Sequence, residues 1–257
     1  MYDATEHTGG SDELDWSKRR RRLRDAPRDV DLFVVALAEI DDWATMSTWW
    51  LGEDELARAR ELREETRRRE FLNSRVVLRR LLALRLDCPP EAVELPRNPT
   101  TGAPGPARVR GVKALEPGDP VQFSLARTSG YVAVAMANRP VGVDLELRQS
   151  NQQSESLLRV LHPSDQSRLL RVPARRRARA VTDAWVRVEA LLKARRTGLS
   201  VDPSTVHVGA ENRVRHPDGL VVTGVRTRRG SQLHAAVAWL EDPLGSPEPW
   251  TDRPMGR

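Results

Sequence analysis

Two helical segments, one in each half of the chain, repeat the same side-chain pattern and constrain the fold more than any other feature. Each carries large or charged side chains at positions i, i+4 and i+8, namely Phe71, Arg75 and Arg79 in the first segment and Trp185, Glu189 and Lys193 in the second. Residues four apart share one face of a helix. The alternative to an internal repeat is a chance similarity between two short amphipathic helices.

The strand patterns around these helices argue for a repeat. Both halves show an opening strand, a short alternating segment after a proline turn that follows the helix, and a closing strand, at 30–36, 92–95 and 130–136 in the first half and at 141–147, 205–208 and 232–239 in the second. We therefore predict an α+β fold of two similar halves that are related by a pseudo-twofold and meet near residue 140.

The predicted halves are residues 29–140 and 141–241. Residues 1–28 are polar and contain the basic run 18–22, which favours a disordered or loosely attached arm. A solvated arm is the simplest interpretation of that run, and contact with nucleic acid is the alternative. Residues 242–257 are rich in proline and glycine, and we expect them to form a flexible tail.

The composition limits the compartment and the partners. The chain has 39% hydrophobic residues and no apolar stretch near the roughly 20 residues of a membrane span, so we expect a soluble protein with no membrane partner. Cys88 is the single cysteine and cannot form an internal disulfide, which is typical of the reducing cytoplasm. The net charge of +6 favours an anionic partner, such as a polyphosphate ligand, an acidic protein or nucleic acid.

Two carboxylates lie two positions apart in the predicted strand at 141–147. Side chains two apart face the same side of a strand, so Asp144 and Glu146 project together while Val143 and Leu145 point into the core. Neighbouring carboxylates repel unless a cation or a proton lies between them, and Mg²⁺ takes oxygen ligands of this kind. The alternative is a solvent-facing strand surface with two ordinary acids.

The second helix adds a carboxylate and an ammonium group on one face. Glu189 and Lys193 form an i, i+4 pair, which on an exposed helix contributes only about 0.2–0.5 kcal/mol. Trp185 lies one turn earlier on the same face, and its burial would draw the pair toward the interface between the halves. Glu189 and Lys193 beside the strand carboxylates would then complete a site for a metal ion and a phosphate group.

Three segments carry a family resemblance: Gly-Val-Asp-Leu-Glu at 142–146, Trp-x-x-x-Glu-Ala-x-x-Lys at 185–193 and Gly-Leu-Ser at 198–200. They are similar to the signature of the 4′-phosphopantetheinyl transferases of the surfactin-synthetase-associated type. The similarity covers roughly residues 30 to 240 in the family's order and spacing, and it includes upstream segments at 53–58, 69–79, 96–104 and 123–128. Each motif alone is weak, whereas the ordered set is fairly specific.

The resemblance implies an enzyme that uses coenzyme A and Mg²⁺. It would move the 4′-phosphopantetheine arm of coenzyme A to a serine of an acyl or peptidyl carrier protein and release adenosine 3′,5′-bisphosphate. By this analogy Asp144, Glu146 and Glu189 hold the metal, and Glu189 also helps to deprotonate the carrier serine. Lys193 would neutralise charge on the phosphate under attack and on the leaving group.

The resemblance also implies where coenzyme A binds. The family's contacts carry over to Arg58, Arg97 and the turn from Ser124 to Arg127. Arginine suits these contacts because its planar guanidinium can donate two hydrogen bonds to one phosphate. The arginine-rich stretch 168–179 is the expected docking surface for an acidic carrier protein. A monomer is expected, since two halves in one chain supply both sides of a cleft that smaller relatives build between subunits.

Three residues depart from the family pattern. Arg127 stands where the family has histidine, Val188 where many members have lysine or arginine, and Ala103 where the family has the lysine of a Gly-Lys-Pro segment. We expect an active enzyme because the metal ligands and the helix lysine remain. The first alternative is a catalytically silent relative that binds coenzyme A or a carrier protein. The second is a nucleic-acid-binding protein, for which 5% aromatic residues offer few stacking surfaces.

Other motifs of catalysis or nucleotide binding do not appear in the sequence. The five histidines show no metal-ligand spacing and are expected to be incidental surface or core residues. Ser124 has no nucleophile-elbow motif around it, and Cys88 precedes two prolines at a predicted helix end, where a packing role is the simpler interpretation. The absence of a P-loop and of a dinucleotide glycine fingerprint removes the commonest nucleotide-binding folds.

Overall fold

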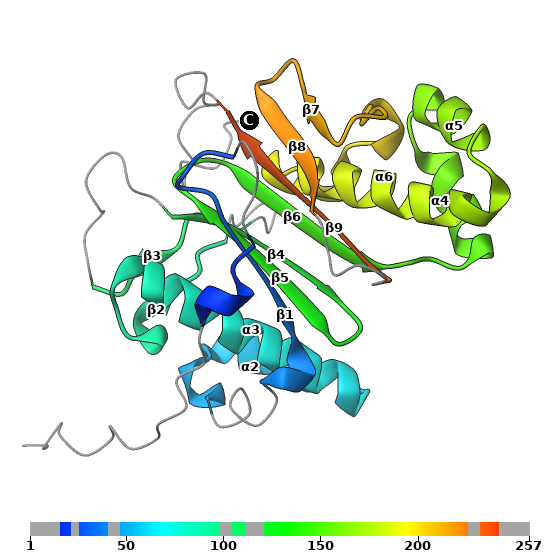
Figure 1. Ribbon diagram of the computed structural model, residues 1–257. Coiled ribbons are helices and arrows are strands. Elements are labelled where there is room, and N and C mark those ends of the chain that lie inside the picture. The colour runs from blue at the N-terminus through cyan, green and yellow to red at the C-terminus, as the bar shows by residue number, and fades with distance from the viewer. Residues whose placement is uncertain are drawn as a thin grey trace, which may run out of the picture.

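The structure of the chain is a computed structural model that describes residues 16–21, 26–40, 47–97, 104–111, 121–225 and 232–241. Its elements form a mixed α+β fold with two main antiparallel sheets and helices packed against each of them (Figure 1). The predicted fold class is confirmed to this extent. Within the described ranges, no helix has the length and apolar character needed to cross a membrane.

The N-terminal sheet has the strand order β1-β5-β4, and its strands are β1 (Asp31–Ala36), β4 (Gln122–Thr128) and β5 (Tyr131–Ala137). A two-residue turn joins β4 to β5, and Gly130 in this turn has φ +73°, a conformation that glycine adopts without steric cost. Alternate apolar side chains of these strands point to opposite faces, and both faces contribute to apolar cores.

The C-terminal sheet has the strand order β6-β9-β8-β7, and its strands are β6 (Val141–Leu147), β7 (Arg213–Arg215), β8 (Leu220–Val225) and β9 (Leu233–Leu240). All of its strand pairs are antiparallel. In each sheet the first strand of the half pairs with the last strand, which in turn pairs with the strand before it. The order β6-β9-β8 therefore repeats the order β1-β5-β4.

One long helix covers the outer face of each sheet (Figure 1). Helix α3 (Glu65–Leu86) packs on the N-terminal sheet, and α6 (Ala174–Ala194) packs on the C-terminal sheet. The inner faces of the two sheets share a third core that includes Leu32, Val143 and Trp239. The outward-facing side chains of each sheet thus meet a helix, and the inward-facing ones meet the other sheet.

The two sheets touch along β4 and β6, which lie side by side (Figure 1). The hydroxyl oxygen of Ser124 accepts a hydrogen bond from the Val143 backbone N–H at 3.0 Å. Further along, Thr128 Oγ1 accepts one from the Leu147 N–H at 3.4 Å. Side chains of β4, rather than its backbone, therefore satisfy these two N–H groups of β6.

Shorter elements complete the described structure. Two short strands, β2 (Val93–Glu94) and β3 (Arg108–Val109), pair with each other. The remaining elements are the helices α2 (Glu53–Arg60), α4 (Asn151–Val160) and α5 (Pro163–Leu170) and the 3₁₀ turns η1 (Trp16–Arg19), η2 (Leu37–Glu39), η3 (Thr48–Trp50), η4 (Pro90–Ala92), η5 (Gly198–Ser200) and η6 (Pro203–Thr205).

The strand predicted at 205–208 is wrong. This segment ends a 3₁₀ turn and continues without strand pairing, although Val206 and Val208 are buried in the C-terminal core. The alternation of apolar residues therefore reflects packing alone. Instead of pairing with a strand, the Val208 N–H donates a hydrogen bond to Asp165 Oδ2 of α5 at 2.9 Å. The matching segment at 92–95 contains only the two-residue strand β2.

Part of the predicted N-terminal arm is attached to the N-terminal sheet. Trp16 is buried, and the Arg21 N–H donates a hydrogen bond to the Leu32 carbonyl oxygen at 2.7 Å. Arg20 forms an ion pair with Asp31. The rest of the predicted arm, at 1–15 and 22–25, lies outside the described residues, and so do the predicted tail at 242–257 and the departure at Ala103.

Candidate active site

Gly142 brings α6 into direct backbone contact with β6. A Cβ atom at this position would lie 2.0 Å from the Ala190 carbonyl oxygen and 2.4 Å from the Ala194 nitrogen. Only glycine, which has no Cβ, permits this approach. Because Glu189 and Lys193 belong to the same turns of α6, the contact holds them next to the side chains of β6 that point toward the helix.

Asp144 is the innermost acid of this site, and its side chain bonds directly to α6. The residue is only 5% exposed, and its Oδ1 accepts a hydrogen bond from Lys193 Nζ at 2.6 Å. Burial raises the pKa of Asp144, and Lys193 offsets part of that rise. Its Oδ2 is buried and, among the described residues, has no hydrogen-bond partner. Burying a carboxylate oxygen without a partner costs free energy, unless the atom binds a metal ion or accepts a hydrogen bond from a ligand.

Glu146 and Glu189 share the electrostatic field of Asp144. Burial and then the charge of Asp144 raise the pKa of Glu146 to about 7. The same two causes raise the pKa of Glu189. Glu146 Oε2 accepts two long hydrogen bonds, both 3.4 Å, from Thr128 Oγ1 and Gln149 Nε2. The three acids predicted as metal ligands therefore interact with one another across β6 and α6.

The donor set of these acids fits a hard divalent cation. All three offer carboxylate oxygens, which Mg²⁺ prefers, and the unpartnered Asp144 Oδ2 lies among them. The three groups do not form a closed cage, because no set of oxygens, one from each of these described residues, lies within 4.8 Å of one another. Repulsion between like charges favours this spacing, and a bound cation would remove the repulsion.

Next to Lys193, a pocket of about 690 Å³ opens between the two halves. Among the described residues that line it, four are cationic and none is an aspartate or glutamate; they are Arg75, Leu95, Arg97, Pro104, Phe123, Ser124, Leu125, Val141, Lys193, Arg196, Thr197, Gly198 and Ser200. The excess of positive charge suits an anionic ligand, and the apolar members of the wall suit an uncharged part of the same ligand.

A buried ion network holds one wall of the pocket. Arg75 is 8% exposed, and its Nε donates a hydrogen bond to Glu55 Oε1 at 2.5 Å, while Arg79 Nε donates to Glu55 Oε2 at 2.6 Å. Burial alone would raise the pKa of Glu55, but the two guanidinium groups outweigh it and hold this pKa below its usual range. One carboxylate faces two cations, so a net positive charge remains beside the pocket.

Three of the predicted coenzyme A contacts, Arg97, Ser124 and Lys193, line this pocket, and the other two, Arg58 and Arg127, do not. The predicted turn from Ser124 to Arg127 is wrong, because both residues lie in the extended strand β4. Strand alternation directs Ser124 toward β6 and Arg127 toward α3, where its guanidinium lies 5.1 Å from the centre of the Phe71 ring. Burial lowers the pKa of Arg127.

Arg58 is the other predicted contact outside the pocket wall. It lies on α2, is largely exposed and forms an ion pair with Glu61. Its charge nevertheless acts on Arg127, together with that of Arg75, and the carboxylate of Glu70 opposes both.

Sequence reasoning missed two pocket residues. Arg75 was recognised as part of the helix repeat, and its four-residue spacing from Arg79 was a signal that both face one partner. Arg196 follows α6 in a left-handed conformation with φ +59°. Nothing in the residue types at the end of this helix distinguishes Arg196 from its neighbour Arg195.

A second hollow, of about 560 Å³, lies beside Glu146. Trp185 of α6 lines it together with polar side chains of α4, namely Gln152, Gln153 and Ser156. Trp185 is half-buried and packs against the C-terminal core. The acid and lysine group of β6 and α6 thus borders two hollows, the first through Lys193 and the second through Glu146.

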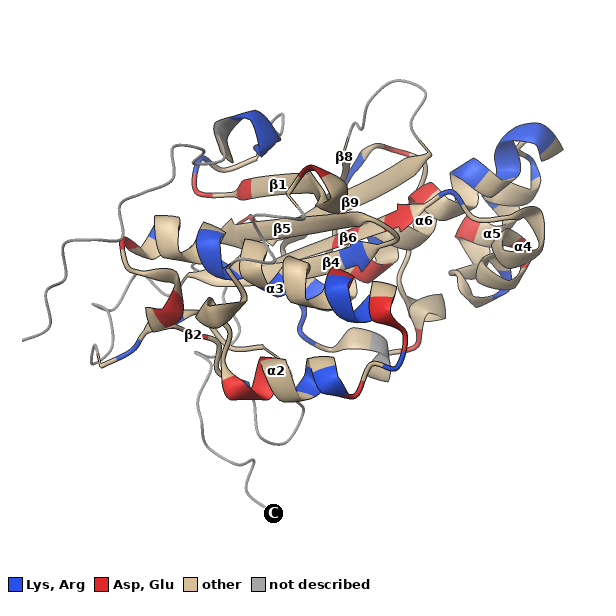
Figure 2. Ribbon diagram, turned by 90° about the horizontal axis from the view of Figure 1, so that it is seen from below, with Lys and Arg blue, Asp and Glu red and all other residues tan. Residues whose placement is uncertain are grey.

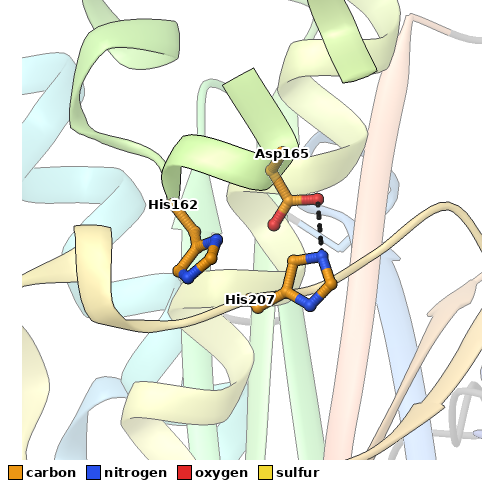
Figure 3. Close-up of side chains that lie close together, drawn as sticks. All are labelled: His162, Asp165 and His207. Carbon is orange, nitrogen blue, oxygen red and sulfur yellow. Dashed lines mark ion pairs between the residues drawn. The ribbon is translucent and has the colours of Figure 1, made fainter. Parts of the chain in front are cut away.

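A separate cluster brings two histidines and an aspartate together, contrary to the expectation that the histidines are incidental. Figure 3 shows His162, Asp165 and His207, whose potential ligand atoms lie within 4.8 Å of one another. His207 Nε2 lies 3.8 Å from Asp165 Oδ1, and the centres of the two imidazole rings are 5.0 Å apart.

The potential metal-ligand atoms of this cluster already accept hydrogen bonds that stabilise the fold. Asp165 accepts hydrogen bonds from the Val208 N–H at 2.9 Å and from the Arg168 guanidinium at 3.0 Å. His162 Nδ1 accepts one from the Ser164 N–H and so caps the start of α5. His162 Nδ1 already accepts a hydrogen bond, and the Arg168 guanidinium already neutralises Asp165. The cluster is therefore better suited to join α5 to the segment after η6 than to bind a cation.

Comparison with known proteins points to one family. Residues 140–217 match the family model described as the 4′-phosphopantetheinyl transferase superfamily. The matched region begins just before β6 and ends after β7, so it contains Asp144, Glu146, Glu189 and Lys193. No curated protein matches the chain. The region that carries the acids and the lysine is therefore similar to enzymes that transfer phosphopantetheine.

Proposed function

We propose that this protein transfers the 4′-phosphopantetheine arm of coenzyme A to a serine of an acyl or peptidyl carrier protein in a Mg²⁺-dependent reaction. The serine Oγ forms a bond to the phosphorus that carries the pantetheine. The bond from that phosphorus to the bridging oxygen breaks, and this oxygen leaves with adenosine 3′,5′-bisphosphate. The serine proton passes to a base of the enzyme.

Each residue of the site has a role in this proposal. Asp144, Glu146 and Glu189 would hold Mg²⁺, which when bound neutralises charge on the pyrophosphate. Glu189 accepts the serine proton, and its raised pKa brings it closer to the range in which a carboxylate is an effective base near neutral pH. Lys193 faces both Asp144 and the pocket, so its ammonium group is placed to neutralise charge on the transferred phosphate.

One observation carries the proposal most strongly. A pocket whose described wall carries four cations and no acid opens beside the buried Asp144 and the half-buried Glu146 and Glu189, and Lys193 contacts both the pocket and Asp144. A ligand that combines a pyrophosphate with a long uncharged arm matches this arrangement better than inorganic phosphate does. The family similarity of residues 140–217 supports the same chemistry.

The carrier protein is proposed to dock at the start of α6. Its first turns carry Arg175, Arg176 and Arg179, which are exposed, and contain no acidic residue (Figure 2). Cations at a helix N-terminus oppose the helix dipole and cost about 0.3–1 kcal/mol each, so their presence there is better explained by a partner than by stability. Arg175→Glu with Arg176→Glu should raise KM for the carrier and leave the affinity for coenzyme A unchanged.

We also infer that the two halves are related by a pseudo-twofold and act as a monomer. The repeated strand order, the one long helix on each outer face and the pocket between the halves support this relation. Sedimentation of the purified protein tests the oligomeric state, and a stable dimer would contradict it.

The function is tested by intact-mass spectrometry of several apo carrier proteins incubated with this protein, coenzyme A and Mg²⁺. Transfer adds about 340 Da, the mass of the arm. The matched control is Glu189→Gln, which keeps the size of the side chain and removes the base. No mass gain on any carrier, with coenzyme A binding shown separately, would refute the transferase.

A catalytically silent relative is the second candidate. Val188, which stands where many family members have a cation, is fully buried in the C-terminal core and cannot reach a ligand. Arg127 stacks over Phe71 outside the pocket wall. Tight binding of coenzyme A without transfer would select this candidate. Restoring transfer by Arg127→His would then assign the loss to that residue.

A further inference from the structure

The two long helices end in the same kind of turn. In α3 the Cys88 N–H donates a hydrogen bond to the Ala83 carbonyl oxygen at 3.1 Å, and in α6 the Thr197 N–H donates to the Leu192 carbonyl oxygen at 3.2 Å. These six-residue closures are Schellman motifs, in which the residue after the helix takes a left-handed conformation. That residue is Asp87, with φ +50°, in the first case and Arg196, with φ +59°, in the second.

Arginine is an unfavourable residue at this position. Glycine is the usual choice because it has no Cβ, and short polar residues such as aspartate are tolerated several-fold better than most others. A long arginine side chain gains no local hydrogen bond that would offset the crowding of its Cβ. Strain of this kind persists when the rest of the structure requires the side chain, and it is concentrated at binding sites.

The Arg196 side chain lies in the wall of the pocket between the halves. Burial lowers the pKa of this guanidinium, and no other charge contributes to the shift. In the part of the chain that the structure describes, no group accepts a hydrogen bond from it. The neighbouring Arg195 differs in both respects, because it has ordinary helical dihedral angles and bonds to Asp218 Oδ2 at 2.7 Å.

The other cations of the wall show why this matters. Arg75 is bonded to Glu55 and Lys193 is bonded to Asp144, so these two already have a carboxylate partner, and Arg97 also interacts with another group. Arg196 brings a half-buried positive charge with no such partner among the described residues to the same cavity. A guanidinium in a partly dry site gains most from a ligand that offers two adjacent anionic oxygens, as a phosphate group does.

We infer that Arg196 is a phosphate-binding residue of this pocket, and that the left-handed turn at the end of α6 is maintained to aim its guanidinium at the ligand. This inference deepens the proposed function, because it takes the pocket to be the coenzyme A site. It assigns to the residue a gain in ligand affinity at the expense of backbone stability.

The opposing effects on affinity and stability define the experiment. Arg196→Gly should raise Tm by about 1–3 °C, because it relieves the left-handed strain and removes a buried charge. It should also weaken the binding of coenzyme A and of inorganic pyrophosphate, each measured by calorimetry, by roughly ten-fold or more, which is the usual loss for a charged hydrogen bond. Arg196→Lys should retain part of the affinity.

Two controls isolate the cause. Asp87→Gly makes the same backbone change at the end of α3 and should leave both affinities unchanged. Arg195→Ala removes a neighbouring cation outside the pocket and should also leave them unchanged. Equal affinities for Arg196→Gly and the wild type would overturn the inference, as would a wild type that binds neither probe. A wild type that binds both through Arg196 but transfers nothing would sink the proposed transferase and leave this inference intact.

Discussion

The faces of α3 and α6 that carry the helix repeat have opposite uses. On α3, Arg75 and Arg79 share the buried carboxylate of Glu55, which α2 supplies, and the ion network is closed by strong hydrogen bonds. On α6, Glu189 and Lys193 face the carboxylates of β6, and the charge of Asp144 raises the pKa of both Glu146 and Glu189. The same helix positions thus complete an ion network in one half, whereas in the other half Lys193 offsets only part of the negative charge of three acids.

The source of the partner explains this difference. Glu55 belongs to α2, a separate helix, and its carboxylate lies between the two cations of α3. Its Oε2 also accepts a hydrogen bond from the Gly52 N–H at 3.0 Å. Asp144 and Glu146 come from one strand, where alternation forces their side chains to the same side. Acids that cannot separate repel each other unless a cation lies between them, so a bound cation would stabilise the C-terminal half more than the N-terminal half.

The largest expected effect concerns Glu55. Glu55→Gln keeps the side-chain volume but leaves Arg75 and Arg79 buried without a carboxylate, which should lower the free energy of unfolding by about 3–5 kcal/mol in urea titrations. Glu61→Gln, which removes an exposed partner of Arg58, should change it by less than about 0.5 kcal/mol. A Glu55→Gln protein as stable as the wild type would show that the α3 network is not structural.

The next effect concerns the close contact of α6 with β6. Gly142→Ala places a Cβ inside the backbone of α6 and should cost about 3 kcal/mol or more in the same titrations. Gly130→Ala is the matched control, because its Cβ would meet nothing within 4 Å and only the positive φ opposes it, at about 1–2 kcal/mol. Equal costs at the two glycines would refute the idea that backbone contact positions α6.

A smaller effect of opposite sign is expected at Glu189. In metal-free buffer at pH 8, Glu189→Gln removes one of the mutually repelling carboxylates and should raise Tm by about 1–3 °C. The same change should lower the transfer rate at least about 100-fold, because the proposed base is lost. A lower Tm would mean that Glu189, like Glu55, stabilises the fold.

The smallest effect is a pH dependence of stability. The pKa of Glu146 is about 7 in the folded protein, against 4.5 for a glutamate in water, so the folded state binds more protons between these values. Metal-free protein should therefore become more stable as the pH falls from about 7 to about 4.5, and Glu146→Gln should flatten this rise in Tm. Added Mg²⁺ should raise Tm more at pH 7.5 than at pH 5, because the ligands must be deprotonated.

Local patterns predicted the main elements well. The strands β1, β5, β6 and β9 lie within a residue of the predicted segments, and the helices α3 and α6 contain the predicted helical segments but are much longer. Periods of 2 and 3.6 are properties of neighbouring residues and can be read from sequence. The shared orientation of Asp144 and Glu146 toward α6 follows from the same alternation. The acidic half of the candidate site could thus be assembled from sequence alone.

Non-local contacts explain what the sequence analysis missed. Glu55 meets Arg75 across 20 positions, and no local pattern indicates which acid neutralises an arginine. Val206 and Val208 alternate like a strand, but the Val208 backbone bonds to a side chain of α5. The left-handed turn at Arg196 contradicts residue preference, and departures of this kind at a binding site cannot be foreseen from preference.

The contact at Gly142 has a consequence for redesign of the site. The absence of a Cβ at this position sets the distance between α6 and β6, and with it the spacing between the candidate ligands that the two elements carry. To make this site accept a larger ion, the distance between α6 and β6 would have to change, and exchanging the acids themselves would change it little. A larger residue at position 142 would instead have to displace α6 as a whole, because the atoms in its way, the Ala190 carbonyl oxygen and the Ala194 nitrogen, belong to the backbone and no side-chain exchange removes them.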